Sequence, residues 1–195
     1  MKTFRSLVGL RMTPGPVATA IRDRLAEIAP ALENVESITT VARVDRADGG
    51  VALVNAWRVN PDLPAALSAL ITPEQMGWLD HAEWSADLAA CRWRIEPLFM
   101  KEAIACAGET RFETAMGGRG TRAIFEGRLD IDPVALSSIP AIWRGPASAA
   151  VELLVGTLIP QNFRRTVEAI AALLNQERSA DEGAVVETQP RIGGC

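Results

Sequence analysis

The chain has 195 residues and a mass of 20.9 kDa, with 48% hydrophobic and 23% charged residues. These values are those of one soluble globular domain and exclude a fibrous or disordered chain. The net charge is −4 and the 20 basic residues are spread along the chain. Nucleic acid is therefore not expected as the main partner, because binding phosphates needs a cluster of positive charge.

The sequence predicts a cytoplasmic protein without stable membrane insertion. No apolar run approaches the roughly 18 residues that cross a bilayer, and the first ten residues, MKTFRSLVGL, lack the cleavage site of a signal peptide. Cys91, Cys106 and Cys195 match no zinc spacing or disulfide framework, and His81 is the single histidine. We therefore expect no metal site and no cofactor.

The first third of the chain predicts a strand, a helix and a hairpin. Residues 3–12 are apolar enough for a strand, and Thr13 before Pro14 is an N-cap followed by a proline in the first helical turn. The β-branched run at 35–44 and the strand at 51–59 flank a tight-turn signal, Asp48-Gly49-Gly50. The inner face of the second strand is predicted to carry Val51, Leu53, Asn55, Trp57 and Val59.

The middle of the chain predicts four more strands after a loop with a short helix at 60–77. Two strands hold Trp78, Trp84 and Trp93, and two longer ones, near 101–116 and 121–131, flank the turn GGRG. Apolar residues alternate with charged ones, as in an antiparallel sheet covered on one face only. His81 and Glu83 fall on the solvent face, and no carboxylate or histidine is assigned to the inner face.

The last long apolar run predicts a helix that covers this sheet. Between residues 146 and 177 apolar side chains recur at steps of three and four, and Pro160 is expected to kink the helix. The residues that follow show no periodicity. We therefore expect a single domain at 1–178 and a flexible tail at 179–195.

The order of these elements resembles the helix-grip fold of the START and SRPBCC superfamily, which includes the birch-pollen allergen type, lipid-transfer domains, and aromatases and cyclases of polyketide pathways. The resemblance covers about residues 2–177 and rests on TFRSLVGLRMTPGPVATAI, the turn DGG, the strands around GGRG, and ASAAVELLVGTLIPQNFRRTVEAIAALL. It implies an α+β fold in which a curved antiparallel sheet of about seven strands grips a long C-terminal helix, with one or two short helices after the first strand. The long connection at 60–77 and Pro160 depart from this pattern.

The resemblance also implies a cavity between the sheet and the last helix, where members of the superfamily hold lipids, sterols, polyketides or other apolar molecules. The expected lining residues are those that point inward from the strands and the helix. They are Asn55, Trp57, Trp78, Trp84, Trp93, Thr110, Phe112, Phe125, Leu154 and Leu158. Each also has a purely structural interpretation, as a core side chain or as a buried polar group bonded to its neighbours.

Three functions fit this sequence. The first is a non-enzymatic binding or carrier protein for a small hydrophobic ligand, and the second is a cyclase or dehydratase of the same fold. The third is an interaction or regulatory domain whose cavity is filled by its own side chains. No catalytic residue is assigned, because there is no G-x-S-x-G motif, no second histidine and no cysteine beside an expected base. An inward carboxylate or histidine would favour the second function.

Overall fold

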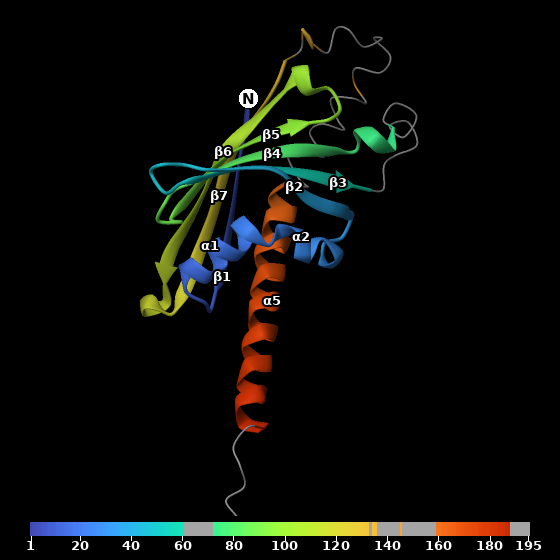
Figure 1. The fold of residues 1–195 in the computed structure, drawn as a ribbon. Helices are drawn as coiled ribbons and strands as arrows, with labels where there is room; N and C mark the ends of the chain where they lie inside the picture. Colours follow the sequence, from blue (N-terminus) through green and yellow to red (C-terminus); the bar gives the residue numbers. More distant parts are fainter. Residues whose placement is uncertain (61–71, 133, 136–144, 146–158, 188–195) are drawn as a thin grey trace, which may run out of the picture.

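The computed structural model describes residues 1–60, 72–132, 134–135, 145 and 159–187, with side chains up to residue 180. Its seven strands form one antiparallel sheet in the order β1-β7-β6-β5-β4-β3-β2, curved around a long C-terminal helix (Figure 1). The strands are β1 (Lys2–Leu10), β2 (Val35–Asp45), β3 (Val51–Val59), β4 (Gly77–Trp84), β5 (Ala90–Pro97), β6 (Ile104–Ala115) and β7 (Gly120–Ile131). The helices are α1 (Pro14–Asp23), α2 (Leu25–Ile28) and α5 (Ile159–Glu187). The expected helix-grip architecture is confirmed.

The inner and outer faces of the strands follow the alternation of the sequence. In β3, Val51, Leu53, Asn55, Trp57 and Val59 are buried, as expected for one face of a half-covered sheet. The β2–β3 hairpin closes through Gly49, whose φ of +83° suits glycine and whose amide donates to the Arg46 carbonyl at 3.0 Å. The turn thereby sets the register that places the inner residues of β3 beside those of its neighbours.

Two glycines on the inner face make room for an aromatic side chain. Gly108 of β6 and Gly127 of β7 are cross-strand partners, and Trp93 of β5 and Phe4 of β1 lie next to them in the same row. A Cβ atom on Gly108 would lie 2.4 Å from Trp93 Cζ2, and one on Gly127 would lie 2.6 Å from Phe4 Cζ. The missing side chains therefore let two rings lie flat against the sheet.

Helix α5 lies across the inner face at its upper end and extends beyond the sheet at its lower end (Figure 1). Pro160 is the second described residue of α5, and the expected kink there would involve the preceding turn, which lies outside the described residues. The expected helical segment at 146–158 and the short helix expected within 61–71 lie outside the described residues. Helix α5 is described as far as Glu187, so residues 179–187, expected in the flexible tail, are helical. Residues 178–182 contain no glycine or proline that would stop the helix after Glu177.

The short helices α1 and α2 are packed against α5 and close one end of the fold. Arg24, between the two short helices, donates to Glu177 of α5 at 2.9 Å and also pairs with Glu27. Val17 and Ile21 of α1 are buried in the same hydrophobic cluster as Val167 and Ile170 of α5. A second cluster, built on β5 to β7, contains the first residue of α5. The space between the two clusters is the candidate site.

Among the described residues no helix is both long and apolar enough to span a membrane. Cys91 and Cys106 are buried free thiols. Burial raises the pKa of the Cys106 thiol to about 12 and that of Cys91 well above its ordinary value. Neither therefore supplies a thiolate near neutral pH.

Candidate functional site: a cavity between the sheet and helix α5

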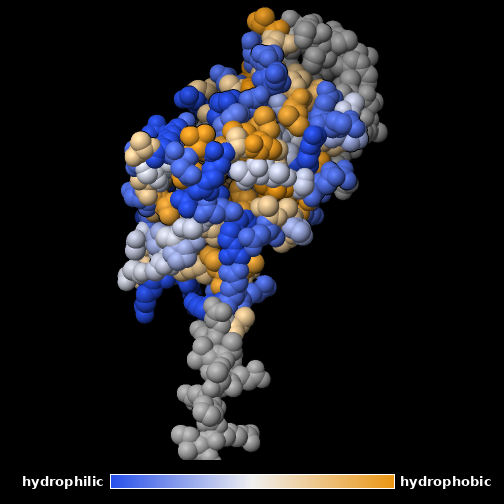
Figure 2. Space-filling model, in the orientation of Figure 1, coloured by the Kyte–Doolittle hydropathy of each residue, from blue (hydrophilic) through white to orange (hydrophobic). Residues whose placement is uncertain are grey.

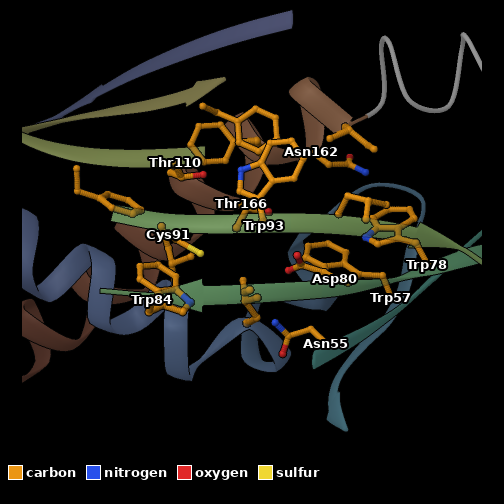
Figure 3. Close-up of a pocket in the computed structure, with 18 residues that line it drawn as sticks. Asn55, Trp57, Trp78, Asp80, Trp84, Cys91, Trp93, Thr110, Asn162 and Thr166 are labelled. Atoms are coloured by element: carbon orange, nitrogen blue, oxygen red, sulfur yellow. The ribbon is translucent and has the colours of Figure 1, made fainter. Parts of the chain in front are cut away.

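A cavity of about 110 Å³ lies between the inner face of strands β3 to β7, helices α1 and α2, and the first turns of α5 (Figure 3). Its described wall comprises 18 residues, seven of them aromatic. They are Ile21, Leu25, Asn55, Trp57, Trp78, Asp80, Ala82, Trp84, Cys91, Trp93, Ile95, Thr110, Phe112, Phe125, Ile159, Asn162, Phe163 and Thr166. The side chains of this wall leave space for a small molecule rather than filling it.

The structure brings eight of the ten expected lining residues to this one wall. Asn55, Trp57, Trp78, Trp84, Trp93, Thr110, Phe112 and Phe125 all line the cavity. The two remaining residues, Leu154 and Leu158, lie outside the described part of the chain. Strand alternation was sufficient to find the eight because inner residues of neighbouring strands in a curved sheet converge on the same space.

The aromatic residues of the wall are stacked in pairs. Trp57 and Trp78 lie 5.3 Å apart between ring centroids, and Trp84 and Phe112 lie 5.7 Å apart. Phe125 lies 4.5 Å from both Trp93 and Phe163, so the sheet and α5 meet through one continuous stack. Such pairs add stability beyond their buried area and hold the rings in fixed orientations.

Two of these tryptophans carry a buried donor without an acceptor. The indole Nε1 atoms of Trp57 and Trp93 have no hydrogen-bond partner among the described residues. A buried, unpaired N–H costs about 1–3 kcal/mol, a cost that phenylalanine at the same position would not carry. The wall is therefore not arranged for maximal stability.

Asp80 is an inward carboxylate, which the sequence analysis did not assign. It lies on β4 between Trp78 and Ala82, with its carboxyl group directed into the cavity (Figure 3). The expectation that no carboxylate reaches the inner face is therefore wrong. The signal was present, because residues 78, 80, 82 and 84 share one face of a regular strand, and Trp78 and Trp84 had both been placed inside.

Asn55 and Thr40 form a chain of polar groups that ends at Asp80. Thr40, Asn55 and Asp80 are successive cross-strand partners on β2, β3 and β4. Thr40 Oγ1 donates to Asn55 Oδ1 at 2.8 Å, which leaves the Asn55 amide nitrogen free to donate to the Asp80 carboxylate. Asn55 is only 2% exposed, so the chain fixes the orientation of its amide within the sheet.

The carboxyl group of Asp80 titrates close to neutrality. Desolvation raises its pKa from 3.8 to about 6, and the hydrogen bond from Asn55 limits that rise. Asp80 is half-buried, and its side chain lines the cavity. Among the described lining residues there is no Lys, Arg or His to neutralise it. The site thus holds one acid that is able to bind or release a proton near pH 6.

His81 and Glu83 point to the opposite side of β4, as expected. His81 Nε2 lies 3.1 Å from Glu96 Oε2, and Glu83 pairs with Arg46 at 3.1 Å. Arg94 and, to a smaller extent, His81 hold the pKa of Glu96 below its usual value. These residues form an outer network of polar contacts and do not line the cavity. Among the described residues there is also no cluster of metal-binding side chains.

The helical part of the wall was not predicted in detail. Helix α5 contributes four residues from its first two described turns to the wall, on the face directed at the sheet: Ile159, Asn162, Phe163 and Thr166. Phe163 belongs to the apolar stripe of the sequence, whereas Asn162 and Thr166 are buried polar residues that interrupt it. The local pattern could not identify these two as inward-facing, because their type is typical of solvent-exposed helix positions.

The geometry allows two kinds of chemistry. The rings offer flat apolar surfaces for a ligand to stack on, and Thr110, Asn162 and Thr166 add hydrogen-bonding groups around them. Asp80 in addition offers a carboxylate for a cation or for a transferable proton. Hydrophobic residues gather in the upper middle of the face in Figure 2, bordered by hydrophilic ones.

No protein-family model and no curated protein matches this sequence. Solved structures of the same fold do match. TTHA0849 from Thermus thermophilus is 18% identical, with a TM-score of 0.56 over 88% of this chain and 95% of that one. The Zhui aromatase/cyclase from Streptomyces sp. R1128 is 13% identical, with a TM-score of 0.57 over 90% and 94%. Norcoclaurine synthase from Thalictrum flavum is 9% identical, with a TM-score of 0.56 over 89% and 86%. These similarities establish the helix-grip fold.

Proposed function

We propose that the protein binds a small hydrophobic molecule, with an aromatic ring as its main recognition element, in the cavity between the sheet and α5. The observation that carries this proposal is the cavity itself, in which seven aromatic side chains surround about 110 Å³ of space. A cavity of similar size, about 150 Å³, holds benzene in another protein. The names of two structural neighbours, an aromatase/cyclase and norcoclaurine synthase, support a small-molecule site in this fold.

Native mass spectrometry of the purified protein tests this proposal. We expect a species heavier than the bare 20.9 kDa chain, and release of the bound molecule on denaturation. In parallel, a panel of single-ring aromatics, fatty acids, sterols and flavonoids is screened for a rise in melting temperature. If only the bare mass appears from several expression hosts and no compound raises the melting temperature, the protein is not a binding protein of this kind.

A variant that fills the cavity provides the matched control. Ala82 is 5% exposed and lines the cavity, so Ala82→Leu places three more carbon atoms in the space that the ligand would occupy. Leu79→Ala, on the outer face of the same strand, changes volume without touching the cavity. Ala82→Leu should abolish the thermal shift of any hit, and Leu79→Ala should retain it.

Asp80 supports a second candidate function, a cyclase or dehydratase. A carboxylate with a pKa of about 6 inside an apolar cavity is suited to remove a proton next to a carbonyl group. In a dehydration, the proton taken by Asp80 returns to the departing hydroxide, so that water and an alkene are formed. The test is a panel of aromatic β-hydroxyketones scored for loss of water. Asp80→Asn should abolish turnover while binding persists, and equal turnover by the variant would remove Asp80 from the mechanism.

We further propose that residues 1–178 act as one domain in the cytoplasm. The continuous sheet and the packing of α1 and α2 on α5 support a single unit. The free thiols of Cys91 and Cys106 support a reducing compartment. Limited proteolysis should leave a fragment that retains the sheet and the packed part of α5, and cell fractionation should recover the protein with cytosolic markers.

A further inference from the structure

Asp80 faces the cavity without a counter-ion from the described part of the chain. On the outer surface acids are paired with arginines, as Asp23 is with Arg22 and Glu96 with Arg94. In the cavity the polar partner of Asp80 is the neutral amide of Asn55, and the other titratable group of the described wall is the Cys91 thiol. One hydrogen bond leaves most of the acceptor capacity of the carboxylate unused.

Three tryptophans neighbour this acid on the inner face of the sheet and line the same cavity. Trp78 lies two residues before Asp80 on the same face of β4. Trp57 on β3 is the cross-strand partner of Trp78. Trp93 is the partner of Ala82, which makes it a diagonal neighbour of Asp80. The faces of indole rings attract cations, and a carboxylate beside several such rings is the arrangement that binds ammonium groups in water-poor pockets.

We propose that the ligand of this cavity carries a protonated amine attached to a single aromatic ring, with its ammonium group on the Asp80 carboxylate and its ring among the tryptophans. The proposal rests on the proposed binding function and specifies its ligand class. We infer the positive charge of the ligand because Asp80 lacks a cationic partner in the described wall. The single ring follows from the volume of about 110 Å³.

The proposal fixes the sign of the pH dependence of binding. With a pKa of about 6, Asp80 is about one-tenth ionised at pH 5 and almost fully ionised at pH 8. An ammonium ligand needs the ionised form, so its affinity should rise about tenfold over this interval, and at pH 5 its binding should release a proton. A neutral ligand favours the protonated acid, so its affinity should stay level or fall. Among the described residues, the groups facing Asp80 from α1, α2, α5 and the other strands are uncharged in this range, the Cys91 thiol included.

The experiment is isothermal titration calorimetry with benzylamine and with benzyl alcohol, its neutral analogue of similar size, on the full chain at pH 5 and pH 8. At pH 8 we expect benzylamine to bind at least about tenfold more tightly than benzyl alcohol, as is typical of a hydrogen bond between charged groups. Asp80→Asn should remove this preference together with its pH dependence. Glu83→Gln, on the outer face of β4, should behave as the unmodified protein.

The outcomes separate this inference from the proposed function. If benzyl alcohol binds as tightly as benzylamine, or if the affinity of benzylamine falls from pH 5 to pH 8, the ligand class is wrong and the binding function stands. A preference for benzylamine that survives Asp80→Asn also overturns the inference, because another group then recognises the amine. If neither compound binds at any concentration up to its solubility, both the inference and the aromatic binding function are overturned.

Discussion

Replacing Asp80 by asparagine should stabilise the protein at neutral pH and leave its stability at acid pH almost unchanged. Asparagine has the shape of the protonated acid and still accepts the hydrogen bond from Asn55, but it carries no charge to desolvate. The substitution therefore removes the unfavourable ionisation of Asp80 and little else. A stabilising substitution at a cavity wall is unusual, since most changes of buried residues destabilise.

The magnitude follows from the difference between the folded and unfolded pKa values. The folded pKa is raised from 3.8 to about 6, so the folded state binds more protons than the unfolded state between these values. Stability from this group is fully present below pH 3.8 and is lost as the pH rises through about 6. The complete loss corresponds to about 3 kcal/mol, an upper bound because the carboxylate is only half-buried.

Urea denaturation followed by the fluorescence of the five tryptophans measures the free energies of unfolding of both proteins at pH 4 and pH 7. Asp23 and Glu96 have lowered pKa values, so the stability that they contribute to the protein is lost as the pH falls. This loss is equal in both proteins. It cancels in the difference between the variant and the unmodified protein. That difference should be only about 0.5 kcal/mol at pH 4 and should approach about 3 kcal/mol in favour of Asp80→Asn at pH 7.

Glu83→Gln is the control, because its side chain is 51% exposed on the other face of the same strand. We expect it to change the free energy of unfolding by about 1 kcal/mol or less at either pH. The opposing outcomes are that Asp80→Asn destabilises the protein at pH 7, or that its effect is the same at both pH values. Either result would mean that the carboxylate is well solvated in the folded protein.

Three further predictions use the same denaturation assay. Gly108→Ala should cost about 3 kcal/mol or more, because its Cβ would lie 2.1 Å from a backbone oxygen, whereas Gly9→Ala, with open space around it, should change stability little. Asn55→Leu removes the hydrogen-bond donor of the ionised Asp80, so the pKa of Asp80 should rise above about 6. The substitution should cost about 1.5–3 kcal/mol more stability at pH 7 than at pH 4. An equal cost at both pH values would mean that the Asn55 amide does not stabilise the ionised Asp80. Arg24→Ala removes the ion pair with Glu177 and should cost about 1 kcal/mol of stability or less. Hydrogen exchange measured separately should become faster in α5 around Glu177. Unchanged exchange there would show that the Arg24–Glu177 pair does not stabilise the helix.

Much of the fold was readable from the sequence because its signals are local. The alternation in β3 to β7 showed which residues share a face, and turn chemistry at Asp48-Gly49-Gly50 showed where a hairpin closes. The strand alternation also identified the aromatic residues that the sheet contributes to the cavity wall. The same alternation contained Asp80, and only the assumption that a charged residue belongs in water kept it out of the predicted wall.

The tertiary structure decided what those faces do. Register between distant strands places Thr40, Asn55 and Asp80 in one row, and a shift of one residue would turn Asn55 away from its partners. The depth of burial that raises the pKa of Asp80 depends on how closely α5 and the short helices approach the sheet, which no local pattern records. By itself the sequence determined which residues of each strand share a face. Only the packing of helix on sheet decided that they enclose a space, and that this space contains an acid without a counter-ion in the described wall.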